Sequence, residues 1–88
     1  MIRRRVVAHG RVQGVFFRDS ARRMARQRGV AGWISNRWDG AVEAVFEGEP
    51  ETVERLVEYM REGPRGAVVE RVDVSEEEPE GLRGFDVR

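Results

Sequence analysis

The stretch with the clearest chemical potential is a glycine-containing turn near the N-terminus. Residues 10–18 have the sequence GRVQGVFFR and connect an alternating apolar run to an amphipathic one. Gly10 and Gly14 allow the backbone to adopt positive φ. Successive backbone N–H groups in such a turn can point inward, and the N-terminus of the following helix adds positive potential. The pattern indicates an anion-binding turn, although any strand-to-helix junction needs a turn for purely structural reasons.

Arg18, at the end of this turn, favours the anion-binding interpretation. A cation in the first turn of a helix opposes the helix dipole, at a cost of about 0.3–1 kcal/mol. The neighbouring Asp19 is the residue that helix stability favours there. A guanidinium beside free amides makes electrostatic sense if an anion lies between them and accepts bidentate hydrogen bonds. The alternative is a surface arginine in a chain whose sixteen basic residues are all arginines.

A second candidate, Asn36, lies in the stretch GWISNRWDG at residues 32–40. It falls near the end of an expected strand, where an asparagine is most often a turn residue. The Asp-Gly pair at 39–40 is typical of a hairpin turn. We expect Trp33 to pack, whereas Trp38 lies on the loop and either packs there or flanks a ligand.

Composition excludes several other kinds of site. The chain has no cysteine for a disulfide or a thiolate metal site, and no lysine for a Walker phosphate loop. Its only histidine, His9, falls in a strand pattern and cannot supply a zinc cluster alone. There is no G-x-S-x-G motif, and no pair of carboxylates stands out. We therefore expect neither a metal nor a cofactor.

Charge and hydropathy indicate the setting in which the protein acts. Sixteen basic and sixteen acidic residues cancel, which argues against bulk nucleic-acid binding. No apolar run approaches the roughly 18 residues of a membrane span, and residues 1–5 lack the apolar stretch of a signal peptide. We expect a cytoplasmic monomer that has no nucleic-acid or membrane partner.

Periodicity predicts the elements that position these residues. Strands are expected at about 2–9, 30–36, 41–47 and 67–74, with a short final strand at 85–87. The acidic segment Ser75 to Glu80 is expected to be a solvated loop. Gly29 is placed to end the first helix and Pro50 to begin the second. The apolar stripes of the two helices are Phe17, Ala21, Met24 and Ala25, and then Val53, Leu56, Val57 and Met60.

The resulting order is βαββαβ with a tail. Two βαβ units with right-handed crossovers predict a ferredoxin-like α+β sandwich, in which an antiparallel sheet carries both helices on one face. Residues 1–88 are expected to form a single domain. This fold carries many unrelated functions, so it does not indicate an activity by itself.

At the two polar stretches the chain resembles the acylphosphatase family, and the resemblance spans essentially all 88 residues. The family's first motif is G-x-V-Q-G-V-x-F-R. Its second places a glycine and an aromatic residue before an asparagine, which is followed by a three-residue gap and a glycine. The matching residues are Gly10, Val12, Gln13, Gly14, Val15, Phe17 and Arg18, then Gly32, Trp33, Asn36 and Gly40, with Val42 and Gly48 in register. The departures, at Ala8, Ile34 and Ser35, concern local packing.

The resemblance implies an acylphosphatase, a hydrolase that splits acyl phosphates into carboxylate and inorganic phosphate. It implies that Arg18 and the amides of the phosphate-binding loop hold the phosphate oxygens, while Asn36 orients a water for in-line attack. The small-molecule substrate is an acyl phosphate, and inorganic phosphate is expected as product and inhibitor. The loop consists of Gln13, Gly14, Val15, Phe16, Phe17 and Arg18.

Two other classes stay open at this point. One is a non-catalytic ferredoxin-like module that binds phosphate groups or RNA, with Arg3–Arg5 and the arginines between 22 and 28 as a basic patch. RNA recognition by such a sheet needs exposed aromatic residues in an RNP pattern, which we do not find. The other is the acylphosphatase-like segment of a larger carbamoyl-transfer protein, which the start and ending of the chain lead us not to expect.

Overall fold

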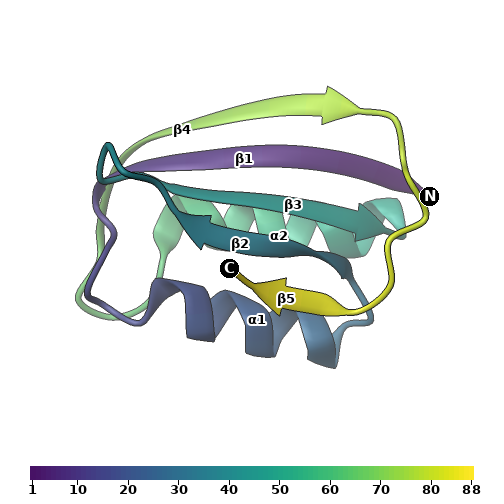
Figure 1. The fold of residues 1–88 in the computed structure, drawn as a ribbon, viewed down its shortest axis with the longest axis horizontal. Helices are drawn as coiled ribbons and strands as arrows, with labels where there is room; N and C mark the ends of the chain where they lie inside the picture. Colours follow the sequence, from purple (N-terminus) through teal and green to yellow (C-terminus); the bar gives the residue numbers. More distant parts are fainter.

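The computed structural model describes all 88 residues, and its strands form one sheet (Figure 1). Both helices lie on the same face of this sheet, as predicted. Neither helix is long and apolar enough to cross a membrane. The elements are β1 (Ile2–Arg11), α1 (Phe17–Gln27), β2 (Ala31–Asn36), β3 (Val42–Gly48), α2 (Pro50–Glu62), β4 (Val68–Glu77) and β5 (Phe85–Val87).

The sheet has the strand order β4-β1-β3-β2-β5. The four longer strands pair antiparallel, as expected for a ferredoxin-like sandwich, but β5 pairs with β2 in parallel. The sheet is therefore mixed and not purely antiparallel. The parallel pairing follows from the route of the chain, because the last residues of β4 and the first residues of β2 lie at the same end of the sheet. The segment after β4 crosses that end, so β5 starts there and runs in the same direction as β2 (Figure 1).

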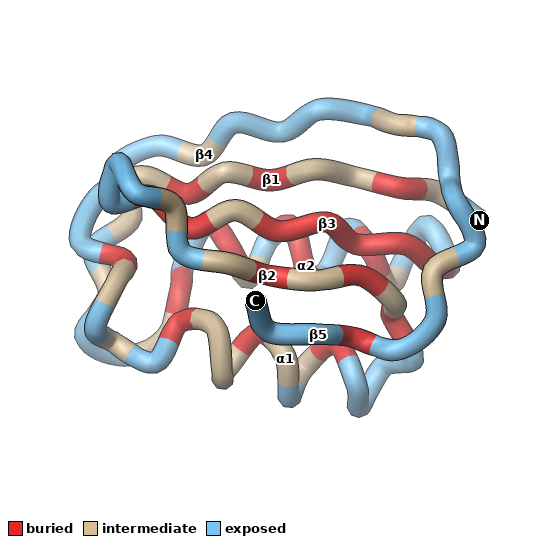
Figure 2. The backbone as a smooth tube through the Cα atoms, viewed as in Figure 1, coloured by how far each residue is buried: buried red, intermediate tan, exposed pale blue.

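The core lies between the helices and the sheet face that they cover (Figure 2). Each helix turns one apolar stripe to the sheet because its apolar side chains recur at the helical period. Met24, expected in the first stripe, packs only at the edge of the core. Phe85 of β5 stacks on Phe46 of β3 with 5.7 Å between the ring centroids, so the short last strand is anchored in the core. The buried helix residues are Phe17, Ala21, Ala25, Val53, Leu56, Val57 and Met60.

The prediction of a solvated loop from Ser75 to Glu80 is wrong for its first half, because β4 continues to Glu77. Glu77 pairs across the ladder with Arg3 of β1. Its carboxylate accepts hydrogen bonds from Arg3 Nε at 2.8 Å and from Arg5 Nε at 2.7 Å. Opposite charges that face each other across two strands stabilise the pairing. The segment is therefore largely solvent-exposed, as expected, but its first residues are strand and Glu77 has cross-strand partners.

A buried carboxylate at the end of β3 holds the segment between β4 and β5. Glu47 is only 1% exposed. It accepts a hydrogen bond from Arg3 Nη1 at 2.6 Å and three from the backbone N–H groups of residues 80–82, at 2.9, 3.1 and 3.1 Å. Burial alone would raise the pKa of Glu47, but the backbone donors and Arg3 outweigh it and leave this pKa lowered. The ionised carboxylate fixes the path of the chain into β5.

Glu47→Gln should lower the free energy of unfolding at pH 7 by about 1.5–3 kcal/mol, the range typical of hydrogen bonds to a charged group. The pKa of Glu47 is lower in the folded than in the unfolded chain. The wild type should therefore lose its stability advantage over the variant at low pH. The loss should begin near pH 4.3, about the ordinary pKa of glutamate, and be complete below the lowered pKa of the folded chain. Urea unfolding at pH 7 and in steps to pH 3 measures both effects, with the exposed Glu78→Gln as the matched control. A deficit that does not change with pH would contradict the assignment.

Candidate active site

The turn between β1 and α1 contains two residues with positive φ. Gly14 has φ 76°, and Phe16, the residue before α1, has φ 62°. Phe16 is the only non-glycine residue of the chain with positive φ. A non-glycine residue in this region costs about 1–3 kcal/mol, and such strain concentrates at functional sites. The turn is therefore held in its shape by the contacts around it.

Two kinds of contact hold the turn. Phe17 is buried and meets Tyr59 of α2 edge-on, with 6.3 Å between the ring centroids, while Phe16 is 81% exposed. The Gln13 side chain donates to the backbone carbonyls of Arg37 at 2.7 Å and Ala41 at 3.0 Å. Gln13 thus ties the turn to the β2–β3 hairpin. Any contribution of Gln13 to anion binding therefore comes from its backbone N–H and not from its side chain.

Arg18 lies in the first turn of α1 and forms no ion pair. Its only hydrogen bond within the protein runs from Nη1 to the backbone carbonyl of Arg88, at 3.0 Å. The adjacent Asp19 pairs instead with Arg22 and with Arg23, the latter at 3.2 Å. No aspartate or glutamate side chain therefore neutralises the charge of Arg18. Its remaining donors are available to an anion.

Asn36 is the last residue of β2, where it pairs with Val42 of β3. It is exposed, and the side-chain hydrogen bond that it receives, from Ser35 Oγ at 3.4 Å, reaches its backbone oxygen and leaves the side-chain amide without a partner in the protein. The turn that follows uses Asp39, whose carboxylate accepts a hydrogen bond from the N–H of Ala41 at 3.1 Å. Asp39 thus has the turn role predicted for it, and Asn36 is left free.

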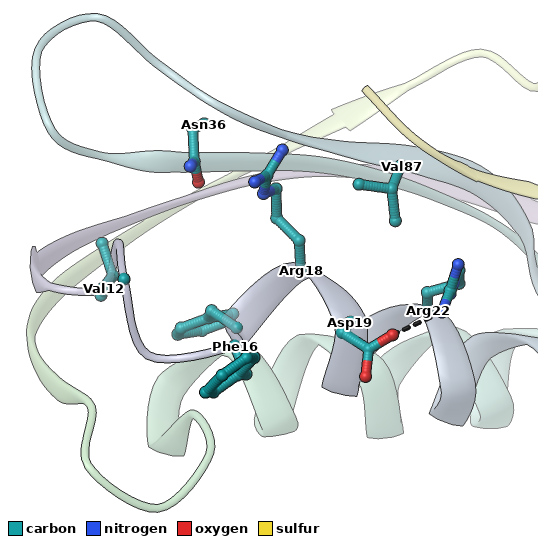
Figure 3. A pocket seen from close by; sticks show the side chains of 9 residues that line it. Val12, Phe16, Arg18, Asp19, Arg22, Asn36 and Val87 are labelled. Carbon is teal, nitrogen blue, oxygen red and sulfur yellow. Dashed lines mark hydrogen bonds and ion pairs between the residues drawn. The ribbon is translucent and has the colours of Figure 1, made fainter.

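One cavity brings the two candidate side chains together. It has a volume of about 390 Å³ and lies between the start of α1 and the strands β2 and β5. Figure 3 shows Arg18 rising from the helix toward the sheet, with Asn36 on one side and Val87 on the other. Val87 could not be expected here from the sequence, because an aliphatic side chain does not indicate a polar site. The lining residues are Val12, Gly14, Phe16, Phe17, Arg18, Asp19, Arg22, Asn36 and Val87.

The other residues considered from the sequence lie outside this cavity. His9 is on β1, with Nε2 2.9 Å from an Asp73 carboxylate oxygen, and this contact lowers the pKa of Asp73. Trp33 packs under the guanidinium of Arg88, 4.6 Å from the ring centroid. Trp38 is 98% exposed, so it does not pack in its loop.

Neighbouring glutamates neutralise Arg3–Arg5, which the RNA-binding alternative would use as part of a basic patch. Arg3 pairs with Glu47 and Glu77, Arg4 with Glu54 and Glu76, and Arg5 with Glu43 and Glu77. Arginines that are already paired offer little net charge to phosphates. Arg3, Arg4 and Arg5 therefore do not form the free basic surface that the RNA-binding alternative requires.

Fold and cavity together define a class of protein: a ferredoxin-like α+β sandwich in which Arg18 of α1 and Asn36 of β2 line one cavity beside a turn with positive φ. The acylphosphatase family model matches residues 4–87. An acylphosphatase from Gloeobacter violaceus is 52% identical over 98% of this chain and 92% of its own length. One from Thermococcus kodakarensis is 57% identical, over 96% of this chain and 97% of its own. The crystal structure of acylphosphatase from Bacillus subtilis superposes with a TM-score of 0.95 at 36% identity, covering 100% of this chain and 99% of that one.

The chain belongs to the acylphosphatase family. It is an enzyme, a hydrolase that cleaves acyl phosphates.

Proposed function

We propose that this cavity is the site of acyl phosphate hydrolysis, with Arg18 and the amides of residues 13–18 holding the phosphate and Asn36 orienting the attacking water. The observation that supports this most is that one cavity is lined by two polar side chains that lack the usual partners. Arg18 pairs with no Asp or Glu side chain, and the Asn36 amide has no hydrogen bond within the protein. Arg18 comes from α1, which follows the strained turn, and Asn36 comes from β2, next to the hairpin to which Gln13 ties the turn.

The reaction needs little beyond positioning and charge. The water oxygen attacks phosphorus in line, the bond from phosphorus to the acyl oxygen breaks, and its electron pair leaves on the carboxylate. A proton of the water passes to solvent or to the product phosphate. Because a carboxylate is a stable anion, its departure needs no general acid. Phosphoryl transfer depends mainly on positioning and on stabilising charge over the equatorial oxygens.

Each group suits its role by its chemistry. The Arg88 carbonyl occupies one donor of the Arg18 guanidinium and so orients the group, while other donors can bind phosphate oxygens in a bidentate manner. An asparagine amide can both accept a hydrogen bond from a water and donate one. It can therefore orient a nucleophile without acting as a base.

The same geometry suggests the partners of the protein. Inorganic phosphate would meet the same donors as the substrate, so we propose that the product also inhibits. Every proposed group comes from one chain, which is consistent with a monomer and with a single domain over residues 1–88. We also propose the cytoplasmic location that the sequence analysis predicts.

Turnover should not depend on a divalent metal, because guanidinium and amide N–H groups donate hydrogen bonds and do not ligate cations. Release of inorganic phosphate from butyryl phosphate, above the spontaneous rate, should be unchanged after exhaustive treatment with EDTA. The control is the same preparation with magnesium restored. Activity that disappears on chelation and returns with magnesium would overturn the proposed mechanism.

A further inference from the structure

The cavity continues past the proposed phosphate position along α1. Beyond Arg18 its lining includes Asp19, Arg22 and Val87. Arg18 and Arg22 are four residues apart on one helix, so their Cβ atoms lie about 5–6 Å from each other. The cavity therefore holds a second guanidinium one helical turn beyond the first (Figure 3).

The charge around this second guanidinium is only partly balanced. Arg22 pairs with Asp19, but the same carboxylate also pairs with Arg23, at 3.2 Å. One negative charge thus serves two positive ones. The whole chain has sixteen basic and sixteen acidic residues, yet within α1 Asp19 is the only acidic residue against four arginines. Helix α1 therefore carries an excess of positive charge.

We propose that Arg22 forms a second anion subsite, which binds a carboxylate at the far end of the acyl group. The preferred substrates are then monophosphates of short dicarboxylic acids. This inference rests on the proposed function, because it places the phosphate at Arg18 and the turn. A short acyl chain leads from there past Val87, and its terminal carboxylate accepts hydrogen bonds from Arg22 in exchange for Asp19.

The chain offers a matched control for this role. Arg23 is the next residue, pairs with the same Asp19 and carries the same charge, but it does not line the cavity. A general effect of positive charge on anionic substrates would depend on both arginines. A subsite would depend on Arg22 alone.

The test compares two acyl phosphates that differ in one terminal group. Fumaryl phosphate ends in a carboxylate, and its trans double bond prevents cyclisation to an anhydride. Crotonyl phosphate has a methyl group in that place. The readout is the ratio of kcat/KM for fumaryl phosphate to that for crotonyl phosphate. Comparing this ratio between variants cancels the different reactivities of the two compounds.

Arg22→Gln should lower this ratio roughly 5- to 20-fold, between the effect of an exposed ion pair and that of a charge-assisted hydrogen bond. Arg23→Gln should leave it within about twofold. Asp19→Asn should raise it, because Asp19 competes with the substrate carboxylate for Arg22. Circular dichroism checks that each variant is folded.

Three results would overturn the inference. An unchanged ratio in Arg22→Gln would mean that Arg22 only stabilises the helix or binds the phosphate itself. An equal drop in Arg23→Gln would mean a general field effect. A lowered ratio in Asp19→Asn would exclude competition for Arg22. Failure of the proposed function would give a different result from failure of the subsite, because the wild type would then hydrolyse neither compound above the spontaneous rate.

Discussion

Replacing Arg18 with lysine should lower kcat/KM for an acyl phosphate roughly 10- to 150-fold, the equivalent of one charge-assisted hydrogen bond of about 1.5–3 kcal/mol. Lysine keeps the charge but loses the planar fork that binds two phosphate oxygens together. It also cannot hold the Arg88 carbonyl and the phosphate in the same geometry. Steady-state kinetics with butyryl phosphate measures the loss. Arg23→Lys, on the same helix and 68% exposed at its side chain, is the control and should stay near the wild type.

Arg18→Ala should lose more activity than Arg18→Lys and should bind phosphate more weakly. Its stability without ligand should change by at most about 1 kcal/mol, because removing a cation from the first turn of a helix offsets the loss of one exposed hydrogen bond. Added phosphate should raise the denaturation midpoint of this variant less than that of the wild type. A nearly wild-type Arg18→Lys enzyme, or an equal phosphate-induced shift in Arg18→Ala, would show that Arg18 is an ordinary surface arginine.

Asn36→Ala should lower kcat by about 10²–10³-fold, the loss typical of removing one group that acts in the transition state. Phosphate inhibition should hardly change, because the proposed role concerns the water and not the phosphate. Steady-state kinetics with and without inorganic phosphate separates the two effects. Ser35→Ala, one residue earlier on β2 and outside the cavity, is the matched control.

The opposite pattern would assign Asn36 to binding. In that case KM and the inhibition constant for phosphate would worsen as much as kcat falls. Asn36 pairs with Val42 directly before the β2–β3 turn. The denaturation midpoint of the variant must therefore match that of the wild type before either interpretation is accepted.

The sequence by itself determined the features that depend on neighbours along the chain. The two helices could be predicted because apolar side chains recur at the helical period within each segment, and this repeat is visible without knowledge of the fold. Gly14 and the residues up to Arg18 are contiguous, so a turn that could bind an anion could be predicted without knowledge of the fold. Asn36 could be named because the motif around it resembles that of a known family. All of these inferences rest on short separations or on a pattern of residue types.

Tertiary structure alone decided which distant groups meet. Glu77 looked like part of a solvated acidic loop until the β1–β4 register placed it beside Arg3 and Arg5. Arg88 reaches Arg18, seventy positions away, because β5 adds to β2 in parallel and ends above the start of α1. Nothing in the sequence showed that Asp19 would pair with Arg22 and Arg23 and leave Arg18 free. Such pairings depend on strand order, register and competition between equivalent charges, which residue types and local periodicity do not encode.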